Sequence, residues 1–164
     1  MVIDPAATEM NAPLNWTIST HYPPHPITQN FDLITAFPLA RAIQAKPGSE
    51  WRTLLETAHR GWISRNDHSS QPAFNKGVDT SGPVKIALTL QRLVDKREQR
   101  IVVVGNGAFL ANTYVGNGGN MDLGINMVNW LTYDDRMIAL QPRPVKDGSI
   151  ILSQFQLGSI MLIS

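Results

Sequence analysis

The segment Arg100–Leu131 constrains the fold more than any other part of the chain. It joins four consecutive β-branched residues, Ile101–Val104, to two loops rich in Gly and Asn and then to an amphipathic stretch. A short apolar run that is bounded by charge and by Gly is typical of a strand covered on both faces. Such a strand needs elements above and below it, so the segment predicts an α/β fold with flanking helices.

Two glycines, Gly105 and Gly107, follow this strand. They predict a tight turn with positive φ and then a short helical turn over 108–111. A dinucleotide fingerprint would need a third Gly where Leu110 stands, and Gly-Lys followed by Ser or Thr occurs nowhere in the sequence. We therefore prefer a turn at the end of a strand to a phosphate-binding site.

The pattern on either side predicts a hairpin and a helix. Val84–Leu90 alternates apolar and polar residues, and the charged turn 95–99 would pair it antiparallel with Ile101–Val104. Downstream, Asn120 is a suitable N-cap for a helix, and the acidic Asp122 would lie in its first turn, where the positive end of the helix favours negative charge. The apolar stripe of this helix consists of Leu123, Met127, Trp130 and Leu131.

Composition excludes several function classes. The 164 residues suit one domain, and a net charge of +1 gives no field that would recruit nucleic acid, so we expect no nucleic-acid partner. The absence of Cys excludes disulfides and a thiol nucleophile. We also expect no cofactor.

Candidate binding residues lie in the two loops. The side chains of Asn106, Asn112, Asn117 and Asn120 would gather at the carboxyl end of the central strand, where open α/β sheets bind ligands. The alternative is that they serve turns and caps. His25, in a Pro-rich loop, is a further candidate contact, or its imidazole satisfies backbone groups of that loop. We expect no metal site at His21 and His25, because no acidic residue or Cys stands at a suitable spacing.

The sequence predicts no enzyme. Ser69, Ser70 and Ser81 lack the Gly-x-Ser-x-Gly setting of an activated nucleophile, and neither His59 nor His68 has an identifiable partner. At the C-terminus, 150–164 is apolar and uncharged but, at about 15 residues, shorter than the roughly 20 of a membrane span. It suits a last core strand or helix, or the start of a transmembrane helix.

Several separated segments resemble the extracytoplasmic region of auxiliary components of ABC transport systems, in proteins similar to the gliding-motility-associated auxiliary component. The resemblance is strongest in Gly-x-x-x-Phe-Leu-x-Asn, which ends at Asn112, and in Asn129–Leu131. The other similar segments are Tyr22–Thr28, Phe37–Arg41, Arg100–Val104, Gly119–Asn120 and 138–143. The family often has Asp where this chain has Asn106, so a role for a carboxylate there does not carry over.

The resemblance implies a flavodoxin-like or class I glutamine-amidotransferase-like mixed sheet with flanking helices, as a fragment that lacks its N-terminal strands. Residues 1–149 would be the C-terminal part of a larger extracytoplasmic domain, and 150–164 the start of a truncated transmembrane helix. It further implies a membrane-anchored protein facing the periplasm or the cell exterior, with ABC permease and ATPase subunits as partners. We expect a non-catalytic interaction or binding domain; the alternatives are a hydrolase of amidotransferase-like fold and a sugar or cell-wall binding module.

Overall fold

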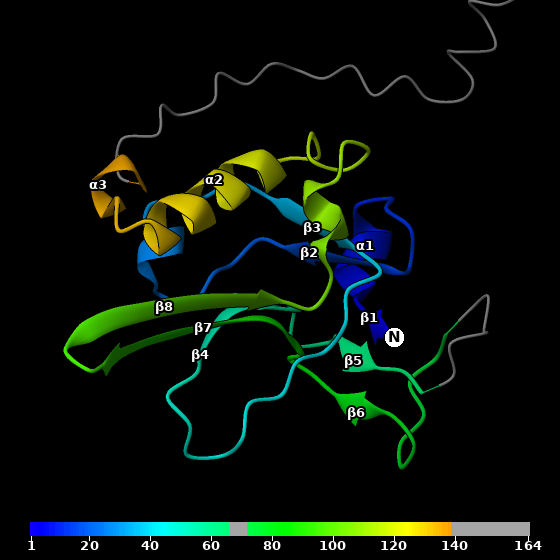
Figure 1. Ribbon diagram of the computed structural model, residues 1–164. Helices are drawn as coiled ribbons and strands as arrows, with labels where there is room; N and C mark the ends of the chain where they lie inside the picture. Colours follow the sequence, from blue (N-terminus) through cyan, green and yellow to red (C-terminus); the bar gives the residue numbers. More distant parts are fainter. Residues whose placement is uncertain (66–71, 139–164) are drawn as a thin grey trace, which may run out of the picture.

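The computed structural model describes residues 1–65 and 72–138, which form three small antiparallel sheets and a few helices (Figure 1). The strands are β1 (Val2–Ile3), β2 (Trp16–Ser19), β3 (Thr35–Pro38), β4 (Arg52–Glu56), β5 (Trp62–Ile63), β6 (Thr80–Ser81), β7 (Lys85–Val94) and β8 (Arg97–Val104). The helices are α1 (Pro5–Glu9), α2 (Asn120–Leu131) and α3 (Asp135–Ile138), with 3₁₀ turns η1 (Pro26–Thr28) and η2 (Gly107–Leu110). His68, Ser69, Ser70 and the tail 150–164 lie outside the described residues.

The hairpin of β7 and β8 confirms the predicted antiparallel pairing, with Leu90 opposite Ile101. It is longer than predicted, because β8 already begins at Arg97 and the turn consists of Asp95 and Lys96 alone. Both turn residues have positive φ, which matches the twist that a two-residue hairpin needs. The charged residues assigned to the turn therefore extend the strand.

Strand β8 is not covered on both faces, so that prediction is wrong. The sheet order is β4-β7-β8, which leaves β8 at an edge. Val102 and Val104 pack against the core, whereas Val103 points to the other face and is 39% exposed. The β-branched run thus reflects strand propensity and burial of one face.

The mixed α/β class is confirmed, but the parallel sheet of a flavodoxin-like or amidotransferase-like core is not shown. Each of the three sheets in the described residues is antiparallel. The hairpin explains the difference, since a charged two-residue turn can join only antiparallel neighbours. Within the same residues, no helix has the length and hydropathy to cross a bilayer.

The main core lies between α2 and the β4-β7-β8 sheet. Figure 1 shows α2 lying across the β7–β8 hairpin. Leu123, Met127 and Trp130 are buried there as predicted, while Leu131 is 38% exposed. The helix ends at Leu131 with Thr132 as its C-cap, and Tyr133 follows with φ 64°.

A second, smaller core links α1 to β2. The buried carboxylate of Asp4 accepts hydrogen bonds from the backbone N–H of Ala6 (3.1 Å) and of Ile18 (3.2 Å). Burial raises the pKa of Asp4 above its ordinary value, although these hydrogen bonds oppose the shift. Asp4 therefore holds the start of α1 against β2.

Candidate functional site

Asn106 follows β8, and its side chain hydrogen-bonds backbone groups of the same chain. Its Oδ1 accepts a hydrogen bond from the N–H of Ala108 (2.8 Å), so it caps η2. Its Nδ2 donates to the carbonyls of Pro38 (3.2 Å) and Leu39 (3.1 Å). The side chain thus joins the turn after β8 to the end of β3.

Asn120 is fully buried and is not the N-cap of α2, which is Gly119. Its Oδ1 accepts from the N–H of Ala36 (2.9 Å), and its Nδ2 donates to the Ala36 carbonyl (2.9 Å). Nδ2 also reaches the carbonyls of Tyr114 (3.0 Å) and Phe109 (3.3 Å). The predicted capping role is wrong because the side-chain amide points into the core, where it hydrogen-bonds both backbone groups of Ala36 in β3.

The other two predicted loop residues lie nearer the solvent. Asn112 is exposed and Asn117 half-buried. An apolar groove beside these loops is lined by none of the four predicted Asn residues. Ligand binding by Asn112 and Asn117 stays a prediction, whereas Asn106 and Asn120 satisfy the backbone of their own chain.

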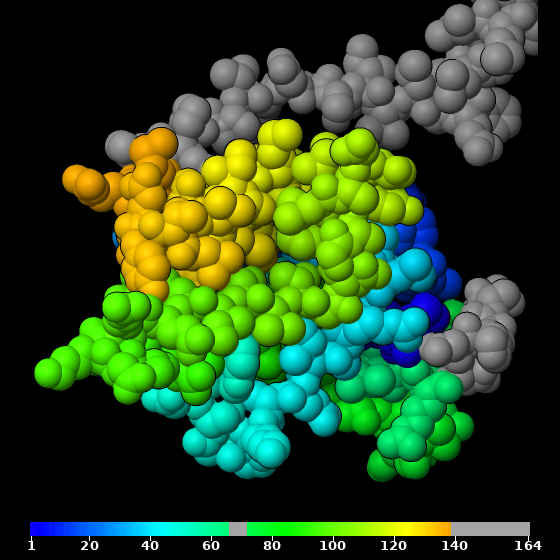
Figure 2. All heavy atoms as spheres, viewed as in Figure 1, coloured from blue at the N-terminus to red at the C-terminus, as the bar shows by residue number. Residues whose placement is uncertain are grey.

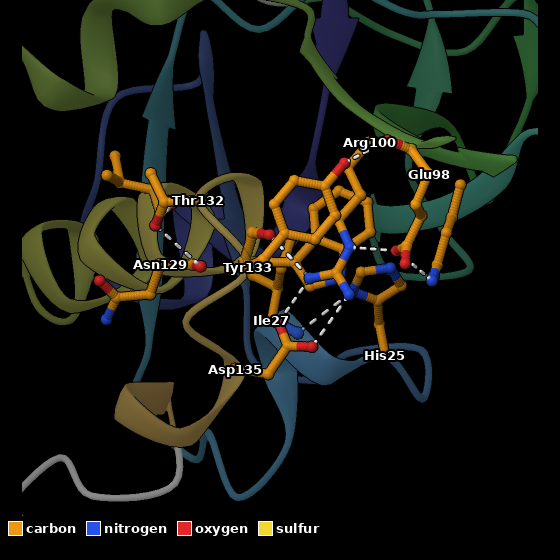
Figure 3. A network of polar contacts seen from close by, with 11 residues as sticks. His25, Ile27, Glu98, Arg100, Asn129, Thr132, Tyr133 and Asp135 are labelled. Atoms are coloured by element: carbon orange, nitrogen blue, oxygen red, sulfur yellow. Dashed lines mark hydrogen bonds and ion pairs between the residues drawn. The ribbon is translucent and has the colours of Figure 1, made fainter. Parts of the chain in front are cut away.

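His25 caps η1 and lies against the core. Its Nδ1 accepts from the N–H of Ile27 (3.2 Å), and its ring contacts that of Trp130 with centroids 5.0 Å apart (Figure 3). Burial, and then the positive charges of Arg52 and Arg100, lower the pKa of His25 to about 4. The imidazole satisfies a backbone group of its loop, which is the alternative that the sequence left open.

Arg100 forms a polar cluster that the sequence did not reveal (Figure 3). Its guanidinium donates to Asp135 (2.6 and 3.0 Å), to Glu98 (2.6 Å) and to the carbonyl of Trp130 (2.8 Å). It also lies 5.1 Å from the ring of Trp130 and 4.5 Å from that of Tyr133. Arg100 therefore fastens α3 and the end of α2 to β8, and these contacts raise its pKa.

We expect His25 to make stability depend on pH. Between about pH 6.5 and 4 the unfolded chain binds a proton at His25 that the folded chain does not, so the free energy of unfolding falls as the pH falls. The full shift corresponds to a loss of about 3 kcal/mol at pH 4, and because solvent screens the half-buried imidazole we expect about 2 kcal/mol. His25→Asn keeps an N-cap acceptor but does not titrate. Urea unfolding of both proteins from pH 7.5 to 4 should show a difference that narrows as the pH falls; a constant difference would contradict this assignment.

The outer face of α2 carries an apolar stripe. Met121, Ile125 and Val128 are 54%, 44% and 56% exposed and follow the i, i+4, i+7 spacing of one helix face. With Leu110 and Val115 from the preceding loop they line a groove of about 280 Å³. The yellow atoms of α2 lie on the molecular surface above β8 in Figure 2. Among the residues that the structure describes, no charged side chain lines this groove.

A more polar pocket of about 400 Å³ lies where β2 and β4 end. It brings Ser19 and His59 into one pocket, together with His21 and Glu56. The Ser19 hydroxyl donates to the carbonyl of Glu56 (3.4 Å) and not to an imidazole, so no activated serine is formed. Among the described residues, no three His, Asp or Glu side chains are placed to hold a metal ion.

Comparisons with known proteins found no relative. No family model matches the chain, and no curated protein and no solved structure matches it either.

Proposed function

We propose that this chain is a non-catalytic interaction domain of a membrane-anchored auxiliary component of an ABC transport system, facing the periplasm or the cell exterior. Its partners would be the permease and ATPase subunits of the same system. The resemblance of the sequence segments suggests the system, and the exposed apolar stripe on α2 is the observation that carries the interaction role.

The stripe suits an apolar helical partner. Met121, Ile125 and Val128 are spaced as in helices that pack in grooves, and Leu110 lies over Gly124, where the absence of a side chain allows close approach. Contiguous exposed apolar surface on a soluble domain marks an interaction site. Because the described part of the chain places no charged side chain in the groove, an uncharged apolar segment of the permease fits it better than a charged peptide.

The finer fold is also a proposal. A flavodoxin-like or amidotransferase-like core needs parallel strands, which would have to pair with a free strand edge. Val2 and Ile3 are 1% exposed, so both faces of β1 are covered, as in the strands of a parallel sheet, and β1 pairs with a neighbour on one side only. We therefore propose the other edge of β1 as the place where further strands pair. A structure of the complete extracytoplasmic region would show a parallel neighbour of β1 if this is correct.

Affinity capture of the tagged membrane protein from the cell that produces it tests the proposed function. We expect permease or ATPase subunits of an ABC system to be identified with the wild type. Val128→Glu places a carboxylate in the apolar groove, so it should reduce their recovery about tenfold or more.

Leu93→Glu is the matched control, because Leu93 is an exposed apolar residue on the far end of β7. It introduces the same charge and should leave capture unchanged. Recovery of the protein without any ABC subunit would contradict the proposed partners. Equal recovery with Val128→Glu would contradict the assignment of the α2 stripe as the contact surface.

A further inference from the structure

The pocket between the ends of β2 and β4 is separate from the α2 stripe and from the Asn-rich loops. Its inner part is formed by Ile18 and Ser19 at the end of β2 and by Thr57 after β4, with Ala6 of α1 beside them. Thr20, His21, Glu56, Ala58 and His59 complete the lining. Its volume of about 400 Å³ lies within the range of small-molecule sites.

The polar groups at this pocket have unused hydrogen-bonding capacity. In the part of the chain that the structure describes, neither the Glu56 carboxylate nor the His59 imidazole has a hydrogen-bond or ion-pair partner. The one hydrogen bond of the His21 imidazole within the described residues joins its Nδ1 to the hydroxyl of Thr20, at 3.0 Å. A carboxylate and two imidazoles therefore surround one pocket with most of their hydrogen-bonding atoms available.

The sheets fix the inner wall of the pocket and Glu56, whereas His21 and His59 lie in the segments that follow β2 and β4. Ser19 ends a strand that pairs along its length with β3, and Glu56 ends a strand that pairs with β7. The Ser19 hydroxyl links the two ends through the Glu56 carbonyl, and the Thr57 hydroxyl accepts from the N–H of Val84 (2.9 Å). Rigid elements of this kind hold a binding site better than free loops do.

The lining limits the chemistry of the ligand. Among the described residues, no Lys or Arg lines the pocket, so an anion would meet the Glu56 carboxylate without a fixed cation to offset it. The lining that the structure describes holds no aromatic ring other than the two imidazoles, so a large flat ring has no surface there on which to stack. Carboxylate, imidazole and hydroxyl groups all exchange hydrogen bonds with hydroxyl groups. We propose that this pocket binds a neutral polyhydroxyl compound, that is, a small sugar.

A titration of the purified 164-residue chain, followed by ¹H–¹⁵N NMR, tests the proposal. N-acetylglucosamine is the neutral probe and glucuronic acid the anionic one. We expect N-acetylglucosamine to shift the amide signals of 18–21 and 56–59, and glucuronic acid to bind more weakly because of Glu56. Glu56→Gln, which removes the charged acceptor, should weaken binding of the neutral sugar about tenfold.

Glu50→Gln is the matched control, since Glu50 is exposed and does not line the pocket. It should leave the affinity unchanged. Should Glu56→Gln not fold, His59→Gln at an exposed position gives a second test, with an expected weakening of several-fold. No shift with the sugar, shifts confined to other residues, or stronger binding of glucuronic acid would overturn the proposal. None of these outcomes bears on the capture of ABC subunits, which the α2 stripe would mediate.

Discussion

Replacing Asn120 by alanine is expected to lower the free energy of unfolding by about 3 to 5 kcal/mol. The amide of this fully buried residue pairs with both backbone groups of Ala36 and reaches the carbonyls of Phe109 and Tyr114. Alanine would leave these buried groups without partners, and each unsatisfied group costs about 1 to 3 kcal/mol. Urea unfolding followed by circular dichroism measures the change.

Two further variants show whether the Asn120 side chain stabilises the fold through its buried hydrogen bonds or as a helix cap. Asp is as good an N-cap as Asn and favours the positive end of a helix, so Asn120→Asp would be harmless at a capping position. A carboxylate cannot donate to three carbonyls, so we expect this variant to be at least as unstable as Asn120→Ala at pH 7. Asn112→Ala, at an exposed position, should change stability by less than about 0.5 kcal/mol. A stable Asn120→Asp would restore the capping interpretation.

Local pattern was enough to predict the β7–β8 hairpin, the turn η2 and the helix α2. The alternation of Val84–Leu90 and the run Ile101–Val104 are properties of the strands themselves, and a short charged connection leaves antiparallel pairing as the simple outcome. These features could be predicted because neighbours in sequence determine them.

The location of β8 in its sheet could not be predicted in this way. Whether Val103 is covered depends on which elements lie beyond the strand, and a buried run and an edge run have the same composition. The same holds for Asn120, whose partner Ala36 is 84 residues away in sequence. A polar residue before a helix is expected to cap it, and only tertiary structure shows that the amide faces inward.

Helix α2 shows why the exposed apolar stripe was missed. The helix is apolar on two faces, one with Leu123, Met127 and Trp130, the other with Met121 and Ile125. Helical periodicity identified the first stripe, which is the core face, but it does not say what covers the second. The pocket between the ends of β2 and β4 was missed for another reason, since His21 and His59 follow different strands and no spacing rule joins them.

Gly105→Ala is expected to lower the free energy of unfolding by about 3 kcal/mol. The sequence predicted positive φ at Gly105 and Gly107, but the glycines with positive φ in the described residues are Gly48, Gly77 and Gly118. Glycine is needed at 105 for space: an added Cβ would lie 2.0 Å from the carbonyl oxygen of Arg41 and 2.9 Å from its carbon. Both are backbone atoms, so β8 or the segment at Arg41 would have to move.

Gly107→Ala distinguishes the two explanations, because nothing lies within 4 Å of the Cβ that it adds. If positive φ were the reason for both glycines, the two variants would lose similar stability. If close approach is the reason, Gly107→Ala should stay within about 0.5 kcal/mol of the wild type, or gain slightly because the unfolded chain is restricted. Urea unfolding of the two variants side by side gives the answer. A large loss at 107 would show that the backbone after β8 needs glycine for its conformation, whereas a loss confined to 105 assigns that residue to the contact with Arg41.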